Sequence, residues 1–510
     1  MDDSKIPILV GCGQITQKEK DPNIALSPMD LTSKACFEAA KDTEIGNIIL
    51  ENLDTILVIR SFSDTSWRFT CPFGKYHNPP LSLANRINSK NVKKYIYTHA
   101  GGNMPQWSVN RICELITKGE VKTALIAGGE SLYTQKKAQR LGLQLDWNEN
   151  PGGKFKEWGI NKKGWSKLED NHGMKGAIYA YPLIENAIRG NEKRTILEHN
   201  KEMGRILAKF SNIAKNNPLA DKQQGYTAEE ISTVNDLNPY IGFPYTKLMN
   251  ANAFIDQSSA IILTNVEYAK KMGIPKNKWV YLHGCADAND HWYLSDRINF
   301  HSSPAINISC SEALKMADCN INDIDIFDIY SCFPSAIKIA CDEMGIDINT
   351  DKTLTVTGGL PYFGGPGNNY VTHSISEMMN RVRNKSTKGL ITANGNYITK
   401  QSIGIYSSEE PIKPFLVKKP SLYQKQIDKL SGPKVNLSPN GNASIETYTV
   451  INDREGPSYS ILFGRMENGS RFIANTPKSK ELMKEMMVSD YLDAKGKVKS
   501  NNGLNIFIPN

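Results

Sequence analysis

Short, continuously apolar stretches alternate along the chain with longer stretches in which apolar residues recur every three or four positions. The first pattern predicts strands covered on both faces of a sheet, and the second predicts helices. Before residue 135 the predicted strands are 6–14, 53–61, 94–100 and 122–131, and the predicted helices are 29–42 and a segment from 103 through Ile116. This order of elements predicts a βαβ unit with a right-handed crossover.

The same rhythm returns after residue 250. Strands are predicted at 258–265, 278–287, 325–333 and 389–399, and helices at 309–318 (capped by Ser309 or Ser311), from Pro334, and at 374–384. In the first half THAGG is followed by a helix and TALIAGGES, and in the second half VTGG and GGPGN are followed by a helix and GLITANGN. This internal repeat predicts a duplicated α/β unit whose glycine-rich strand ends surround a shared centre.

Two segments break the rhythm. Residues 135–245 are polar and rich in Lys and Asn, and we interpret them as a mostly helical insertion with one long helix at 185–216. From residue 416 the pattern is that of strands, with ENGS at 467–470 as a turn. The predicted domains are therefore an N-terminal half (1–134 and 246–265), the insertion (135–245), a C-terminal half (266–415) and a β-rich, OB-like domain (416–510).

Composition excludes several classes of protein. The nine cysteines are scattered without a CxxC pair, which disfavours a disulfide framework or a zinc cage. No run of about 18 apolar residues predicts a membrane span, and the acidic start MDDSKIPILVGCGQ lacks the basic region of a secretory signal. We therefore expect a cytoplasmic protein that does not act at a membrane.

The net charge of +8 leaves two interpretations open. It is either a solvated surface rich in Lys and Asn or an attraction for an anionic ligand such as a phosphorylated cofactor. Binding of nucleic acid is not expected, because no dense cluster of Lys and Arg is interleaved with aromatic residues. An exposed row formed by Tyr448, Tyr459 and Phe463 would favour it, but alternation along the strand predicts Tyr459 and Phe463 in the core.

Five motifs in order, THAGGNMPQ, ALIAGGES, DIYSCFPSA, GGLPYFGGPGN and TANGN, resemble the thiolase superfamily over residues 6–410. The tail FGRMENGSRFIANTP is similar to the extra C-terminal domain of thiolase-like proteins named acetyl-CoA acetyltransferases. The resemblance implies a five-layered α/β/α/β/α fold, acyltransferase activity in lipid metabolism, and a coenzyme A thioester as substrate or ligand, without a tightly bound cofactor. It also implies a homodimer formed through the core, although a monomer stays possible.

The residues that carry thiolase chemistry are replaced in this chain. The resemblance implies a nucleophilic cysteine at a helix start, where Gly101 or Gly102 stands, and a GHP histidine, where Gly365 stands. A second cysteine is replaced by Ala393 or Asn394. Covalent acyl transfer at the first position is therefore not expected, although backbone N–H groups there can still bind an oxygen or a thioester. The alternative function is a non-catalytic CoA-binding or scaffold protein.

The remaining candidates each have two interpretations. Cys332 is a small buried apolar residue or a relocated nucleophile, and His373 is a structural hydrogen-bonding residue or an acid–base group. Asn103 caps a helix or binds substrate, and Asn394 donates to a carbonyl oxygen or forms a left-handed turn. The predicted catalytic residues are Cys332, His373, Tyr330 and Asn394, and the predicted substrate-binding residues are Gly101, Gly102, Asn103, Gly364, Gly365 and Gly395. No metal is expected. The residues His283, Cys285, Asp287 and His291 lie close together in the sequence, but no second pair of ligands at the spacing of a zinc site accompanies them.

Overall fold

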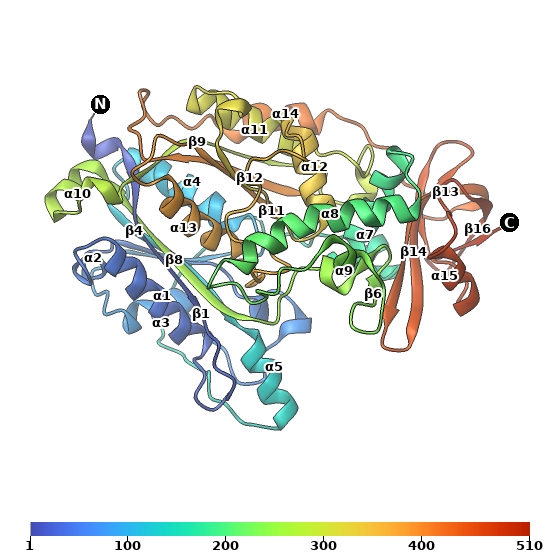
Figure 1. The fold of residues 1–510 in the computed structure, drawn as a ribbon, viewed down its shortest axis with the longest axis horizontal. Coiled ribbons are helices and arrows are strands. Elements are labelled where there is room, and N and C mark those ends of the chain that lie inside the picture. Colours follow the sequence, from blue (N-terminus) through green and yellow to red (C-terminus); the bar gives the residue numbers. More distant parts are fainter. Residues whose placement is uncertain (1) are drawn as a thin grey trace.

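The computed structural model describes residues 2–510. Its largest element is a ten-stranded sheet with the order β10-β11-β12-β9-β1-β8-β4-β2-β3-β5 (Figure 1). The first half contains β1 (Pro7–Thr16), β2 (Thr55–Val58), β3 (Lys94–Thr98), β4 (Thr123–Ser131) and β8 (Asp256–Asn265). Strand β2 runs parallel to β3 and β4, whereas β8 runs antiparallel to β1 and β4. The strands predicted in this half are therefore present within a few residues.

The second half of the sheet repeats the first. It contains β9 (Val280–Asn289), β10 (Ile326–Asp328), β11 (Gly389–Gly395) and β12 (Lys400–Ser407). The order β9-β12-β11-β10 matches β1-β8-β4-β2, and Thr353, which bridges to Ile326, stands where β3 stands in the first half. The predicted duplication is thus confirmed, although β12 was not predicted and the predicted strand at 325–333 is shorter.

Helices form the other layers. Helices α4 (Met104–Thr117) and α13 (Tyr370–Val382) pack together between the two halves of the sheet, α4 against β11 and β12 and α13 against β1 and β8. On the outside, α1 (Pro28–Asp42) and α3 (Pro79–Arg86) cover the first half, and α11 (Pro304–Ala317), flanked by α12 (Pro334–Met344), covers the second (Figure 1). The five-layered α/β/α/β/α fold is confirmed. Two short helices, α2 (Ile48–Glu51) and α10 (Val266–Met272), complete this part.

Two helices begin earlier than the sequence predicted. Helix α11 starts at Pro304, and the side chain of Ser303 accepts a hydrogen bond from the Ile306 N–H, so neither Ser309 nor Ser311 is the cap. Proline is favoured in the first turn, where its missing N–H would have no partner. Helix α13 starts at Tyr370 rather than at residue 374.

The segment predicted as an insertion contributes to both sheets. It contains α5 (Leu132–Leu141), α6 (Lys167–Asn171), α7 (Ala177–Asn191), α8 (Ile196–Lys215), α9 (Ala228–Ser232), β5 (Lys156–Trp158), β6 (Tyr240–Gly242) and β7 (Tyr245–Thr246). The single helix predicted at 185–216 is wrong. Lys193 has a left-handed φ of 54°, and Thr195 and Glu198 form a capping box that starts a new helix. Strand β5 lies beside β3, and β6 pairs with β13.

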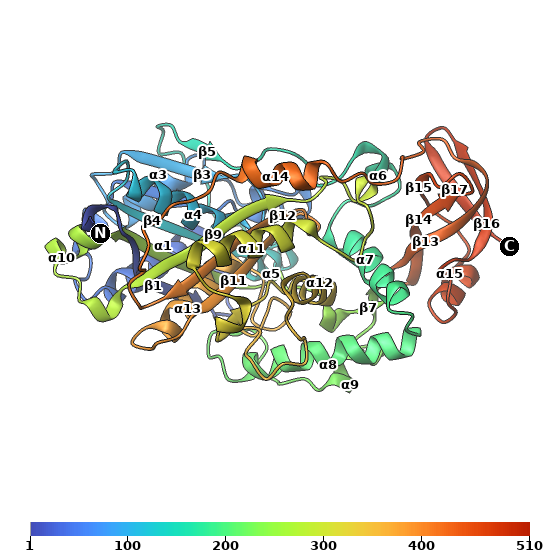
Figure 2. The same ribbon diagram turned by 90° about the horizontal axis from the view of Figure 1, so that it is seen from above.

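The C-terminal segment folds into a second, β-rich unit at the end of the molecule opposite α10 (Figure 2). It contains β13 (Asn440–Asp453), β14 (Gly456–Met466), β15 (Arg471–Ala474), β16 (Lys495–Asn501), β17 (Leu504–Pro509) and α15 (Lys480–Met486), whereas α14 (Pro420–Asp428) packs on β9 and α11. The order is β15-β14-β13-β16-β17, and Asn475 bridges to Ile506, which closes the sheet on itself. Tyr448 and Phe463 are fully buried, so they are not available to stack on bases.

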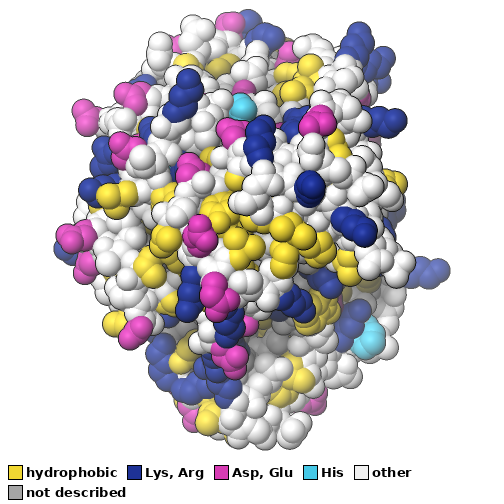
Figure 3. Space-filling model, turned by 90° about the vertical axis from the view of Figure 1, so that its right-hand side faces the viewer, with side chains coloured by type: hydrophobic (Ala, Val, Ile, Leu, Met, Phe, Trp, Pro, Cys, Tyr) yellow, Lys and Arg dark blue, Asp and Glu magenta, His cyan; other side chains and the backbone are white. Residues whose placement is uncertain are grey.

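An ion pair between a buried arginine and a half-exposed aspartate links the C-terminal unit to α7. The guanidinium of Arg189 on α7 is 1% exposed and donates two hydrogen bonds of 2.8 Å to the carboxylate of Asp490. Figure 3 views the molecule from this side, where hydrophobic side chains gather across the middle of the face among scattered Lys and Arg. Within residues 2–510, no helix has the length and apolar character needed to cross a bilayer.

Candidate functional site

The predicted centre lies where the turn between β3 and α4 meets the second half of the sheet. A Cβ atom on Gly102 would collide with the Tyr330 hydroxyl oxygen and would stand 2.7 Å from the Asn394 carbonyl oxygen. Tyr330 therefore fills the space into which a side chain at residue 102 would point. A cysteine at this position, as the thiolase pattern requires, would have no room.

Lys400 fills the neighbouring space. A Cβ atom on Gly101 would lie 2.6 Å from Lys400 Nζ and 2.5 Å from Asn103 Oδ1, and one on Gly395 would meet the same two side chains. Lys400 is 3% exposed and its ammonium donates to the Ala100 carbonyl. Burial lowers the pKa of Lys400 to about 8. The paired glycines thus make room for Tyr330 and Lys400, which the sequence analysis did not connect with them.

The polar groups at the helix start are partly used by the protein itself. The Gly101 N–H donates to Asn368 Oδ1 at 2.9 Å, and the Asn368 amide donates to the Arg60 carbonyl at 2.8 Å. Asn103 stands at the N-cap position of α4, but its side chain forms no cap hydrogen bond, and its Oδ1 is buried without a partner. Asn103 therefore holds the cap position predicted for it, but its side chain does not cap the helix.

Cys332 and Asn394 lie next to the same centre. The Asn394 amide donates to the Tyr181 hydroxyl at 2.9 Å, and its Oδ1 is buried without a partner. The left-handed turn belongs to Asn396, with φ 57°, and not to Asn394. Burial raises the pKa of Cys332 to about 12, so the thiol is protonated at neutral pH. This environment is that of a buried apolar cysteine rather than of an activated nucleophile.

His373 lies apart from these residues, on the face of α13 that packs against β1. Its Nδ1 is 2.9 Å from Gln14 Oε1, and its ring packs edge-on against Phe363. Burial lowers the pKa of His373 to about 3, so the ring is neutral. The glycines predicted to bind substrate in the same region, Gly364 and Gly365, pack against Gln257 and Asn252, respectively.

A cluster of cations surrounds Lys136, and the sequence analysis missed it. We define the cationic cluster as Arg68, Lys136, Arg140 and Arg454. Burial lowers the pKa of Lys136, and the charges of the other three lower it further. Within residues 2–510, none of the four forms a salt bridge. A cluster of like charges without counter-ions is typical of a site for an anion.

Aromatic rings accompany the cationic cluster. Lys136 Nζ lies 3.6 Å from the centroid of the Phe254 ring, which is 6.0 Å from the ring of Phe69. Phe254 lies two residues after Asn252, whose carbonyl accepts a hydrogen bond of 2.8 Å from the Gly365 N–H. Arg454 comes from the turn between β13 and β14, so both units of the chain contribute cations.

The residues considered for zinc do not come together. Nε2 of His283 is 2.8 Å from the Glu409 carbonyl oxygen, and Nε2 of His291 is 2.7 Å from the Leu430 carbonyl oxygen. Across the described residues, no three His, Cys, Asp or Glu side chains stand close enough together to hold a metal ion.

Comparison with solved structures decides the family. A monomeric SCP2-thiolase-like protein type 1 from Mycobacterium smegmatis has 31% identity to this chain, with a TM-score of 0.86 and all of both chains covered. The chain belongs to the SCP2-thiolase-like protein type 1 family. The "Thiolase-like protein type 1 additional C-terminal domain" also matches residues 423–503 of this thiolase-like protein.

More distant proteins share the fold. The dimeric peroxisomal thiolase of Saccharomyces cerevisiae and the human mitochondrial 3-ketoacyl-CoA thiolase each have 14% identity and a TM-score of 0.55 over 80% of this chain and 98% of theirs. An acetyl-CoA acetyltransferase of Methanocaldococcus jannaschii is 26% identical over 99 residues, which is 19% of this chain and a quarter of that relative's length. The predicted homodimer of this thiolase-like protein stays a prediction.

Proposed function

We propose that this thiolase-like protein binds a coenzyme A thioester without forming the acyl-cysteine intermediate of a thiolase. The shared fold supports the choice of ligand, since the human mitochondrial 3-ketoacyl-CoA thiolase was solved in complex with CoA. A common fold alone does not carry a function, so the proposal depends on the groups present in this chain.

The observation that carries the proposal is the cationic cluster with its aromatic rings. The diphosphate and 3′-phosphate of CoA are anions that arginine and lysine bind through charge-assisted hydrogen bonds. In the proposed complex the adenine ring stacks on Phe69 or Phe254, whose ring centroids lie 6.0 Å apart. Since the Gly365 N–H donates to the Asn252 carbonyl, two residues before Phe254, a bound nucleotide would extend toward Gly365.

The absence of an acyl-cysteine follows from the centre itself. Gly102 has no nucleophile, and the Tyr330 hydroxyl occupies the space that a cysteine side chain would need. The same filled centre favours the second candidate function, a scaffold protein that has kept the thiolase core without its ligand. The two functions differ in whether CoA binds at all.

Calorimetric titration with free CoA separates the two functions. Binding is expected for the wild type, and the double variant Arg68→Ala/Lys136→Ala should weaken it by about tenfold or more, because each charged hydrogen bond contributes about 1.5–3 kcal/mol. Affinity should fall as salt rises. Lys41→Ala, which removes a cation that is 81% exposed on α1, is the matched control and should bind as the wild type does.

Two results would count against CoA binding at the cationic cluster. Failure of the wild type to bind CoA would favour the scaffold, and equal loss of affinity in the Lys41→Ala control would show that the cluster has no special role. Thiolysis of acetoacetyl-CoA is expected to be absent in every variant. Turnover in the wild type would contradict the part of the proposal that concerns chemistry.

A further inference from the structure

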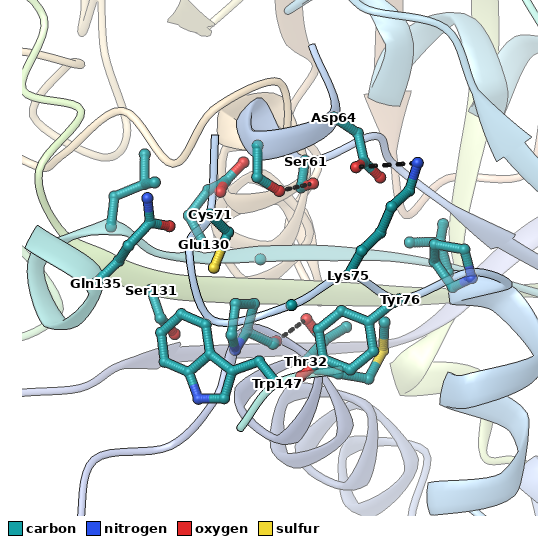
Figure 4. Close-up of a pocket in the computed structure, with 18 of the residues that line it drawn as sticks. Thr32, Ser61, Asp64, Cys71, Lys75, Tyr76, Glu130, Ser131, Gln135 and Trp147 are labelled. Atoms are coloured by element: carbon teal, nitrogen blue, oxygen red, sulfur yellow. Dashed lines mark hydrogen bonds and ion pairs between the residues drawn. The ribbon is translucent and has the colours of Figure 1, made fainter. Parts of the chain in front are cut away.

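A cavity opens beside the end of β4 (Figure 4). Its free space is about 50 Å³, and its mouth is open to solvent. Its walls are largely apolar and include Val58, Ile59, Leu132, Tyr76 and Trp147. Largely apolar cavities hold small organic groups in many proteins, when a few polar groups fix the orientation.

Glu130 is a buried acidic residue in this wall. It is 3% exposed, and its Oε1 accepts the Phe62 N–H at 2.7 Å. Its carboxyl lies against Gly367, where a Cβ atom would not fit. Burial raises the pKa of Glu130 to about 8, with Asp64 and Asp256 adding to the effect. The carboxyl therefore carries a proton at neutral pH and has an O–H group to donate.

The other charged groups of the cavity already have partners. Asp64 accepts the Tyr97 hydroxyl at 2.8 Å, and Lys75 Nζ lies 4.0 Å from its carboxylate. The cavity therefore offers a neutral acid and apolar walls rather than an unpaired charge. A carbonyl compound with an apolar tail matches this chemistry better than an ion does.

Consecutive residues of α5 connect the cavity with the cationic cluster. Gln135 lines the cavity and donates from Nε2 to the Phe69 and Thr70 carbonyls, at 3.2 Å each. Lys136, the next residue, belongs to the cluster. A single elongated ligand passing over this segment would have its anionic end at the cluster and its other end in the cavity.

We propose that this cavity holds the acyl group of the thioester, with Glu130 donating a hydrogen bond to a carbonyl oxygen of the acyl group. The inference rests on the proposed function, since it assigns the acyl end of the same ligand. It moves the acyl site away from Gly102 and Tyr330, where the thiolase pattern would place it.

Alkylation of Cys71 tests the inference without any substitution. Of the nine cysteines only Cys71 and Cys319 are partly exposed, and Cys71 lines the cavity whereas Cys319 does not. Hexanoyl-CoA at about ten times its Kd should slow alkylation of Cys71 by N-ethylmaleimide about tenfold, because only the unoccupied fraction reacts. Free CoA should leave Cys71 reactive, and neither ligand should change Cys319, the matched control.

A variant separates the acyl site from CoA binding. Glu130→Leu should bind free CoA as the wild type does and lose the protection of Cys71 by hexanoyl-CoA, whereas Glu130→Gln, which keeps a donor, should retain it. If CoA binds but hexanoyl-CoA does not protect Cys71, the inference is wrong and the proposed function stands. If free CoA does not bind, the proposed function falls, and hexanamide tests the cavity alone. Protection of Cys71 by hexanamide would support an acyl site, and its absence would overturn it.

Discussion

Replacing Glu130 by glutamine should stabilise the protein, and the gain should grow with pH. The glutamate has an ordinary pKa of 4.5, which burial raises to about 8 in the folded state. Between these values the folded protein holds a proton that the unfolded chain has released. A protein that holds an acid whose pKa is raised on folding therefore loses stability as pH increases between the two pKa values, by about 1.4 kcal/mol per pH unit.

The size of the effect at pH 7 follows from these values. Protonating the buried carboxyl at this pH costs about 3 kcal/mol, which a neutral glutamine of the same shape avoids. With an unfolding entropy of about 2.1 cal/mol/K per residue, a chain of 510 residues changes its Tm by about 1 °C per kcal/mol. Glu130→Gln should therefore melt about 3 °C above the wild type at pH 7 and at about the same temperature near pH 4.5.

Scanning fluorimetry from pH 5 to pH 8 provides the comparison. The control is Glu120→Gln, which removes an exposed carboxyl just after α4. The difference in Tm between this variant and the wild type should be the same across the pH range. A Tm difference for Glu130→Gln that stays constant from pH 5 to pH 8 would show that Glu130 is ionised in the folded protein. The donor assigned to the acyl site would then not exist.

Three further predictions concern packing and charge. Gly102→Ala should destabilise by about 1–3 kcal/mol, because its Cβ meets the Tyr330 hydroxyl, and adding Tyr330→Phe should recover part of the loss in denaturant unfolding. Asp490→Ala removes the carboxylate that pairs with the buried Arg189 guanidinium, so it should cost about 1.5–3 kcal/mol and speed proteolysis of the C-terminal unit; unchanged proteolysis would contradict this. Burial lowers the pKa of Lys400 to about 8, so the stability of the wild type relative to Lys400→Met should rise from pH 8 to about pH 10, by about 1.4 kcal/mol per pH unit. A stability difference that does not change with pH would refute this prediction.

The sequence predicted the scaffold because its signals are local and repeated. Apolar runs such as 122–131 and glycine pairs at strand ends recur in both halves, and each is visible within about ten residues. The break in the helix predicted at 185–216 was also local, since Thr195 and Glu198 have the spacing of a capping box. It was missed because the apolar periodicity continues on both sides of it.

The side chains that meet at the turn between β3 and α4 could not be predicted in the same way. Gly101 and Lys400 are far apart in the chain, and only the packing of α4 against β12 brings them together. His373 was a reasonable candidate by its position before a helix, but the helix turns its ring toward Gln14. Glu130 carried one usable signal, since it is an acidic residue at the end of an otherwise apolar strand.

A structure of the protein with hexanoyl-CoA would test the central claim most directly. We predict an intact thioester, with its phosphates among Arg68, Lys136 and Arg454, its acyl chain beside Glu130, and Tyr330 still packed against Gly102. An acyl group bonded to a protein side chain, or an acyl chain lodged at Gly102 with Tyr330 displaced, would contradict that claim.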